Sequence, residues 1–144
     1  MQTFLPYSDF HKTAKVLDYR RLGKQRVEAM QIINVIDKIN LGARCAWMGH
    51  PAVLMWAGYE QALKLYHNIM IVEWVRRGYN NNMKLMDIPD NIEYPHWLGD
   101  ERLHRSHRSA LLYKDFRYYS QFNWAEKPEL NYFWAEGKKN GQKN

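Results

Sequence analysis

Residues 51–77 read PAVLMWAGYEQALKLYHNIMIVEWVRR and carry the clearest helical pattern in the chain. Pro51 suits the first turn of a helix, and Gly78 suits the position after its end. Between them the large apolar side chains recur on one broad face, at Val53, Trp56, Leu63, Tyr66, Met70 and Trp74. The pattern predicts a helix from Pro51 to Arg77. A helix of this length in a globular domain either bends or lies at the centre of the core.

Three further helices are predicted on either side of this stretch. The first is capped by Ser8 and ends near Gly23, which marks a stop or a tight bend. The second starts at the next residue, continues with apolar residues at helical spacing and ends at Gly42. The third is capped by Asp100 and ends near Tyr113.

The segments between these helices have the composition of loops. Residues 41–50 contain two glycines, and residues 79–98 are rich in Asn, Asp and Pro. We therefore expect an all-α fold, with residues 1–135 forming one compact helical domain that carries long irregular loops. Residues 136–144 are polar and contain Gly and Lys, which predicts a flexible tail.

The composition is that of a globular domain with many aromatic side chains. Of the 144 residues, 46% are hydrophobic and 25% are charged, which favours a packed core over disorder. The aromatic share of 15% exceeds what a compact core requires, so some rings are predicted at a working surface. With Cys45 as the single cysteine and no apolar run long enough to span a bilayer, we expect a cytoplasmic protein.

A net charge of +6 favours an anionic partner such as nucleic acid. The densest group of cations lies at the junction of the first two predicted helices: Arg20, Arg21, Lys24 and Arg26. Side chains of this kind bind phosphates together with backbone N–H groups at the start of a helix. The same run also suits a solvated surface paired with Asp18 and Glu28, and spacing alone favours neither alternative.

A second group of basic residues lies in the helix predicted after Asp100: His104, Arg105, His107 and Arg108. On a helix, His104, His107 and Arg108 share one face and Arg105 lies on a neighbouring one, so donors are available to DNA phosphates. A solvated helix face is the next alternative. A metal site is less favoured, because no carboxylate or thiol has the spacing that would complete a ligand set with the two histidines. We therefore expect phosphate contacts here, with no metal or cofactor.

Glu28 follows the first basic group by one helical turn. A carboxylate in this position can assist proton transfer or stabilise a cation that forms on a sugar. From the residues alone, a salt bridge with Lys24 at a spacing of four residues is the favoured role.

Three parts of the sequence point to one known family: MQTFLPY (1–7) with LDYRRLGKQRVE (17–28), HPAVLMWAGYE (50–60), and WLGDERLHRSHRSALL (97–112). Together they resemble the pyrimidine-dimer DNA glycosylases, the endonuclease V type of ultraviolet-damage repair enzymes, in a divergent bacterial and phage branch. The resemblance covers the chain from Met1 to about Tyr119.

The resemblance implies a compact helical enzyme that acts as a monomer on damaged double-stranded DNA in the cytoplasm of a bacterium or a phage-infected cell. Such an enzyme bends the DNA, flips a base and attacks C1′ of the damaged nucleotide with its N-terminal α-amine. The resulting Schiff base then permits strand cleavage by β-elimination at the abasic site. A free α-amine suits this chemistry because part of it is unprotonated near neutral pH.

The resemblance also implies the catalytic residues. Bulky Gln2 should prevent removal of the first residue, so the nucleophile would be the amine of Met1. The family glutamate follows a Tyr-Arg pair, whereas this sequence has Arg21 after Tyr19 and Arg20. Glu28, two turns later, is the substitute that we assign as acid and base. Both basic groups would hold DNA phosphates.

Two other functions fit the same residues. Arg21 and Gln2 depart from the family pattern, which would suit a nucleic-acid-binding protein without catalysis. A glycosylase for a modified base, rather than for a dimer, is the other alternative.

Overall fold

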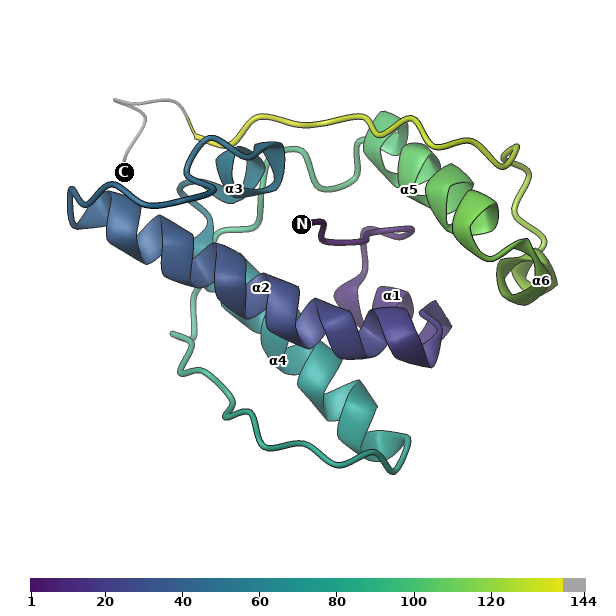
Figure 1. Ribbon diagram of the computed structural model, residues 1–144, viewed down its shortest axis with the longest axis horizontal. Helices are drawn as coiled ribbons and strands as arrows, with labels where there is room; N and C mark the ends of the chain where they lie inside the picture. Colours follow the sequence, from purple (N-terminus) through teal and green to yellow (C-terminus); the bar gives the residue numbers. More distant parts are fainter. Residues whose placement is uncertain (139–144) are drawn as a thin grey trace.

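The computed structural model describes residues 1–138, which form helices joined by irregular segments (Figure 1). The helices are α1 (Phe10–Val16), α2 (Tyr19–Asn40), α3 (Pro51–Trp56), α4 (Glu60–Arg76), α5 (Glu101–Lys114), α6 (Phe116–Tyr119) and the 3₁₀ helix η1 (Ser120–Phe122). This part of the chain contains no strand, so the prediction of an all-α fold is confirmed.

The two longest helices, α2 and α4, pack against each other at the centre of the fold (Figure 1). Gly23 lies inside α2, and a Cβ atom at this position would lie 2.9 Å from a ring carbon of Trp74 on α4. The glycine thus lets the two helices approach closely. α2 begins at Tyr19, because the Asp18 side chain accepts a hydrogen bond from Arg21 N–H and caps the helix. The predicted helix end at Gly23 is therefore wrong.

The single helix predicted from Pro51 to Arg77 is also wrong, because residues 57–59 separate it into α3 and α4. Gly58 has a φ of +84°, in the left-handed region that favours glycine, and turns the chain between the two helices. The apolar spacing remains helical on both sides of this turn. Periodicity therefore did not reveal it.

The chain after η1 runs along α5 and reaches α3 (Figure 1). Gly137 N–H donates to the carbonyl of Leu54 at 3.1 Å, so a carbonyl in the last turn of α3 receives a partner from the C-terminal segment. Of the tail predicted at residues 136–144, Gly137 and Lys138 are hydrogen-bonded to Leu54 and Ala57 at the end of α3. The remainder, 139–144, lies outside the described residues.

The predictions for α5 and for the loops are confirmed. Asp100 caps α5 by accepting from Arg102 N–H at 3.0 Å, and the helix ends at Lys114, one residue beyond the predicted end. Residues 41–50 and 79–98 contain neither helix nor strand. Within residues 1–138, no helix combines the length and apolar composition needed to cross a membrane.

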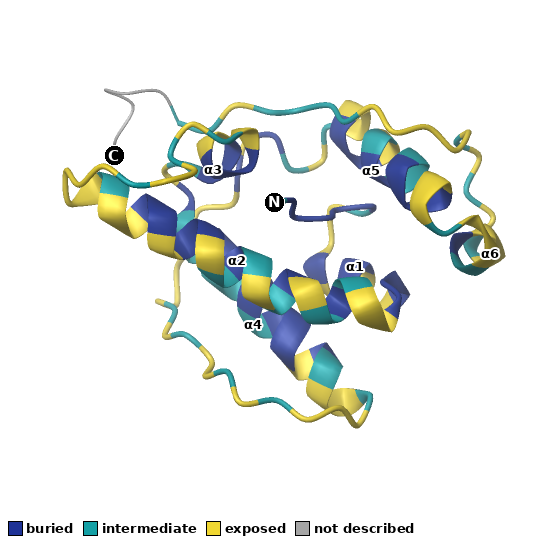
Figure 2. Cartoon of the chain, viewed as in Figure 1, coloured by how far each residue is buried: buried dark blue, intermediate teal, exposed yellow. Residues whose placement is uncertain are grey.

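The start of the chain lies between α2, α3 and α5 rather than at the periphery (Figure 1). Residues 2–6 are all buried, although they form neither helix nor strand (Figure 2). Buried backbone groups outside regular structure need other hydrogen-bond partners. In this fold side chains of the surrounding helices supply several of them.

Candidate active site

The first six residues form a segment whose backbone is bonded by side chains from three helices. Phe4 N–H donates to Gln25 Oε1 on α2 at 2.9 Å, and the Tyr66 hydroxyl on α4 donates to Phe4 C=O at 2.8 Å. Leu5 N–H donates to His107 Nδ1 on α5 at 2.8 Å. The beginning of the chain therefore has a defined position inside the fold.

The Glu28 carboxylate lies beside this segment. Gln2 N–H and Gln25 Nε2 each donate to Glu28 Oε2 at 3.2 Å, and Gln25 Nε2 also donates to Gln2 C=O at 3.0 Å. Gln25 is 1% exposed, so it holds both the segment and the carboxylate in place. Glu28 is therefore hydrogen-bonded to Gln2, the residue that directly follows Met1. In residues 1–138 its hydrogen bonds to Gln2 and Gln25 stand in place of the predicted salt bridge with Lys24.

The charges of the N-terminal ammonium and of the Glu28 carboxylate both affect His50. Burial lowers the pKa of His50, the N-terminal ammonium lowers it further, and Glu28 raises it. The His50 Nδ1 atom accepts from Ala52 N–H at 3.0 Å and caps α3. The start of α3 therefore lies close enough to the N-terminus and to Glu28 to be affected by their charges.

The two histidines predicted to contact phosphates are buried and bind the N-terminal segment instead. His104 Nε2 accepts from Gly99 N–H at 2.9 Å, so its Nδ1 donates to Leu5 C=O at 2.7 Å. His107 is fully buried and holds Leu5 N–H. The prediction that they bind DNA is wrong, because the N-terminal segment covers this face of α5. No three His, Cys, Asp or Glu side chains in residues 1–138 are placed to hold a metal ion.

Because of His107, the free energy of unfolding should depend on pH. Burial, with a smaller effect of His104, lowers the pKa of His107 to about 3, below its ordinary value near 6.5. The unfolded chain therefore binds a proton that the folded chain excludes. Stability from this group is complete above about pH 6.5 and falls by up to about 1.4 kcal/mol per pH unit as the pH is lowered towards 3.

The expected result is that His107→Asn loses less stability than the wild type between pH 7 and pH 4 in chemical denaturation. The Asn side-chain oxygen can still accept from Leu5 N–H, and His107 Nε2 has no hydrogen-bond partner within residues 1–138 to be lost. His11→Asn, at an exposed histidine, is the control. Parallel pH curves for the wild type and His107→Asn would contradict the assignment.

Arg108, like the two histidines, binds other parts of the chain. Its side chain is 12% exposed, donates to Pro6 C=O at 2.7 Å and pairs with Glu126 at 2.9 Å. Its contact with a DNA phosphate stays a prediction, and in this structure Pro6 C=O and Glu126 hold its guanidinium. Arg105, on a neighbouring face of α5, is exposed, and its DNA contact stays a prediction.

We expect Arg108→Ala to lower the free energy of unfolding by about 2 kcal/mol, since Pro6 C=O and Glu126 would both lose a largely buried charged partner. Arg105→Ala, three residues earlier on the same helix, should change it by less than about 0.5 kcal/mol. Urea denaturation of the two variants makes the comparison. Unchanged stability of Arg108→Ala together with weakened DNA binding would instead support Arg108 as a phosphate ligand.

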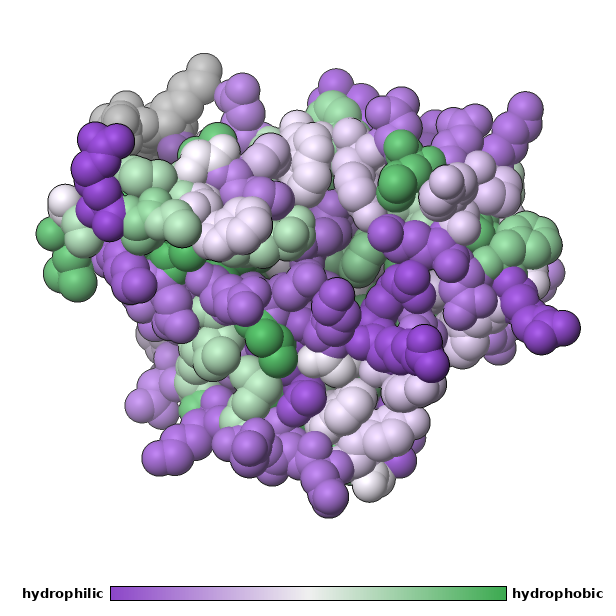
Figure 3. Space-filling model, viewed as in Figure 1, coloured by the Kyte–Doolittle hydropathy of each residue, from purple (hydrophilic) through white to green (hydrophobic). Residues whose placement is uncertain are grey.

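A cavity of about 800 Å³ opens at the start of the chain, and we refer to it as the N-terminal cavity. It brings together the two predicted catalytic residues and three of the predicted DNA-binding residues: Met1, Glu28, Arg20, Arg21 and Lys24. Hydrophilic side chains gather over the N-terminal half of α2 (Figure 3). Arg26 does not line the N-terminal cavity and donates to Asn81 Oδ1 at 2.6 Å.

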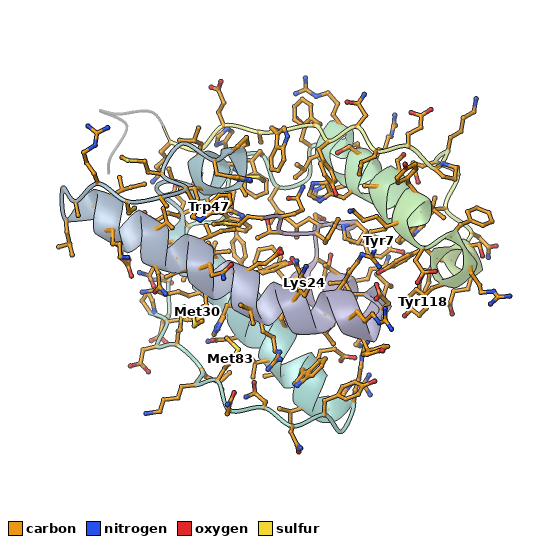
Figure 4. The ribbon with its side chains drawn as sticks, in the orientation of Figure 1. Tyr7, Lys24, Met30, Trp47, Met83 and Tyr118 are labelled. Carbon is orange, nitrogen blue, oxygen red and sulfur yellow. The ribbon has the colours of Figure 1, made fainter. Side chains whose placement is uncertain are left out.

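The other wall of the N-terminal cavity comes from residues that the sequence did not reveal. Lys114, Asp115 and Tyr118, at the junction of α5 and α6, face the cavity together with Tyr132. Figure 4 shows Lys24 on α2 and Tyr118 on α6, two elements far apart in the sequence. For the two tyrosines the only signal in the sequence was the high aromatic content, which does not say which rings line a site. The sequence held no signal for Lys114 and Asp115.

A family model for pyrimidine dimer DNA glycosylases matches residues 1–87, more than half of the chain. The chain belongs to this family. The matched region contains α1 to α4, both Met1 and Glu28, and the cations of α2. No curated protein and no solved structure matches the chain.

Membership makes the chain a DNA glycosylase, with DNA as its substrate. In this glycosylase the N-terminal cavity has one wall inside the matched region and one outside it. Residues 88–138 supply Lys114, Asp115, Tyr118 and Tyr132. The second wall is therefore the part of the site about which the family match says nothing.

Proposed function

We propose that this glycosylase excises pyrimidine dimers from double-stranded DNA through the α-amine of Met1, and that it cleaves the strand at the resulting abasic site. The observation that carries the proposal is the hydrogen bond of 3.2 Å from Gln2 N–H to Glu28 at the N-terminal cavity. It brings the predicted acid and base next to the residue that carries the predicted nucleophile.

In the first step, a bond between the amine nitrogen and C1′ replaces the glycosidic bond. The amine lone pair forms a bond to C1′ while the bond between C1′ and the base breaks, and the departing base keeps the electron pair and takes up a proton. The Glu28 carboxylate stabilises the positive charge that develops on the sugar and accepts a proton from the attacking amine. Opening of the sugar ring, with a proton delivered to its oxygen, gives a protonated Schiff base.

The second step cleaves the strand. The Schiff base makes the C2′ hydrogen acidic, and loss of this proton expels the 3′ phosphate as a leaving group. Glu28 is the group of the N-terminal cavity to which we assign this proton. The cations Arg20, Arg21 and Lys24, which line the N-terminal cavity, would hold the flanking phosphates.

The proposed chemistry uses residues of one chain, Met1 and Glu28 with the cations of α2. We therefore infer that the glycosylase acts as a monomer. No residue of a second copy is needed for the chemistry.

Borohydride reduction tests the mechanism, because it converts a Schiff base into a stable covalent adduct. The wild type should form an adduct with duplex DNA that contains a pyrimidine dimer or an abasic site. A variant with two extra residues before Met1 should form none, because its α-amine no longer lies beside Glu28. Absence of adduct from the wild type on both DNAs, or an undiminished adduct from the extended variant, would overturn the proposal.

A further inference from the structure

Arg21 differs from the other α2 cations of the N-terminal cavity because the fold holds its side chain. Its Nη1 donates to Asp18 Oδ1 at 3.1 Å, in a pair whose side chains are 23% and 9% exposed. Arg20 and Lys24 line the same cavity but are exposed, and Arg20 donates to the equally exposed Tyr19. An exposed cation can meet a phosphate from many directions, whereas the Arg21 guanidinium has a defined orientation.

Asp18 is itself held from the α6 side of the N-terminal cavity. The Tyr119 hydroxyl on α6 donates to Asp18 Oδ1 at 2.5 Å and accepts from Asp18 N–H at 3.0 Å. Tyr119 is fully buried and stacks on Trp124, with 5.6 Å between ring centroids. Burial and the hydrogen bond to Asp18 raise the pKa of Tyr119, so its hydroxyl remains a neutral donor. A buried ring on α6 is thus joined through Asp18 to a cation on α2.

One edge of the Arg21 guanidinium is free to bind a ligand. Within residues 1–138 its Nε and Nη2 atoms have no hydrogen-bond partner, and neither of them is buried. Because Arg21 lines the N-terminal cavity, both N–H groups are open to a ligand there. Two donors on one edge of a guanidinium match two oxygens of a phosphate.

Arg21 lies on the same face of α2 as Glu28, which follows it by seven residues. Both line the N-terminal cavity together with Met1. The two charges act on one hydroxyl, since burial raises the pKa of Tyr132, Arg21 lowers it and Glu28 raises it again. A nucleotide whose phosphate binds Arg21 can therefore present its C1′ to Met1 and Glu28.

We propose that Arg21 binds a phosphate next to the damaged nucleotide in one orientation and so fixes C1′ opposite the Met1 amine. Asp18 and Tyr119 are positioning residues, which act through Arg21. Loss of Arg21 should therefore lower the rate at which bound DNA reacts more than it lowers affinity. The inference rests on the proposed function in taking Met1 as the nucleophile.

The test measures the rate of borohydride trapping on duplex DNA with an abasic site, as the protein concentration is raised to saturation. Arg21→Ala should lower the maximal rate about 100-fold, the loss that a misplacement of about 1 Å can cause. Arg20→Ala should act mainly on the protein concentration that gives half of the maximal rate. A wild-type maximal rate in Arg21→Ala, or an equal loss in both variants, would overturn the proposal.

A double-mutant cycle tests the role of Tyr119. Tyr119→Phe removes only the hydroxyl and should lower the maximal rate about tenfold. In the Arg21→Ala background the same change should have no further effect, because the side chain that it positions is gone. Tyr113→Phe, at an exposed tyrosine of α5 that does not line the cavity, is the control. At a temperature where every variant is folded, equal effects of Tyr119→Phe in both backgrounds would overturn the positioning role.

Uncharged phosphate analogues identify the group that Arg21 binds. A methylphosphonate replaces, in turn, each of the two phosphates that flank the abasic site. At one of these positions it should slow the wild type to the rate of Arg21→Ala and leave the rate of Arg21→Ala unchanged. If the analogue slows both proteins by the same factor at both positions, Arg21 does not bind a flanking phosphate and the proposal fails.

Trapping also separates this inference from the proposed function. A wild type that forms no adduct would overturn the proposed function, and the inference with it. A wild type that forms the adduct no faster than Arg21→Ala would leave the Met1 mechanism standing and remove only the role of Arg21.

Discussion

Glu28→Gln is expected to lower the rate of base excision by about 10²- to 10⁴-fold, the range typical for loss of a general acid or base. The amide has no negative charge with which to stabilise the sugar cation, and it cannot take up the proton of the amine. Its oxygen can still accept from Gln2 N–H and Gln25 Nε2, so the fold and the N-terminal cavity should persist. Single-turnover cleavage of dimer-containing duplex measures the rate.

The matched control is Glu60→Gln. Glu60 accepts from Asn40 and from Gly58 N–H, and it does not line the N-terminal cavity. This variant should cleave at the wild-type rate, and both variants should bind DNA with unchanged affinity. If Glu28→Gln keeps the wild-type rate, the acid and base must be another group, and the proposed mechanism loses its central residue.

Gln25→Leu is expected to lower the free energy of unfolding by about 3 kcal/mol. The substitution leaves Phe4 N–H and Gln2 C=O without their side-chain partner in a buried environment, at about 1 to 3 kcal/mol for each group. Tyr66 keeps its bond to Phe4 C=O, which limits the loss. The N-terminal segment should also detach more easily, so excision should slow in the variant at a temperature where it remains folded.

Urea denaturation gives the stability, and Gln31→Leu is the control, because Gln31 is an exposed glutamine on the same helix. Protection of the backbone amide of Phe4 from hydrogen exchange reports on the segment itself. It should fall in Gln25→Leu by more than global stability requires. Wild-type protection in this variant would show that Gln25 does not anchor the segment.

The two glycines at which prediction failed illustrate what local sequence leaves undecided. Gly23 was expected to end a helix but lies inside one, whereas Gly58 was expected within a helix but breaks it. Trp74, which contacts Gly23, lies 51 residues further along the chain, and Lys138, which packs over Gly58, lies 80 residues further. A glycine that ends a helix and one that permits a close contact look alike until that contact is known.

The predicted site residues also include some that local sequence placed correctly and some whose surroundings it could not predict. Met1, Glu28 and the cations of the first basic group were identified from the sequence and its resemblance, and the fold places all of them except Arg26 at one cavity. His104, His107 and Arg108 were correctly placed on one helix face, but that face binds residues 5 and 6 of the chain. Helical spacing says which side chains share a face and not what covers it.

The sequence by itself determined the all-α class, the cap and extent of α5, the positive charge of α2 and the family of the chain. These features depend on residues close together in the sequence, or on a pattern shared with relatives. Only the tertiary structure decided that the N-terminus is buried beside Glu28, and that Tyr118 and Tyr132 complete the N-terminal cavity. Those contacts join residues up to about 130 positions apart, and packing of the whole core selects them.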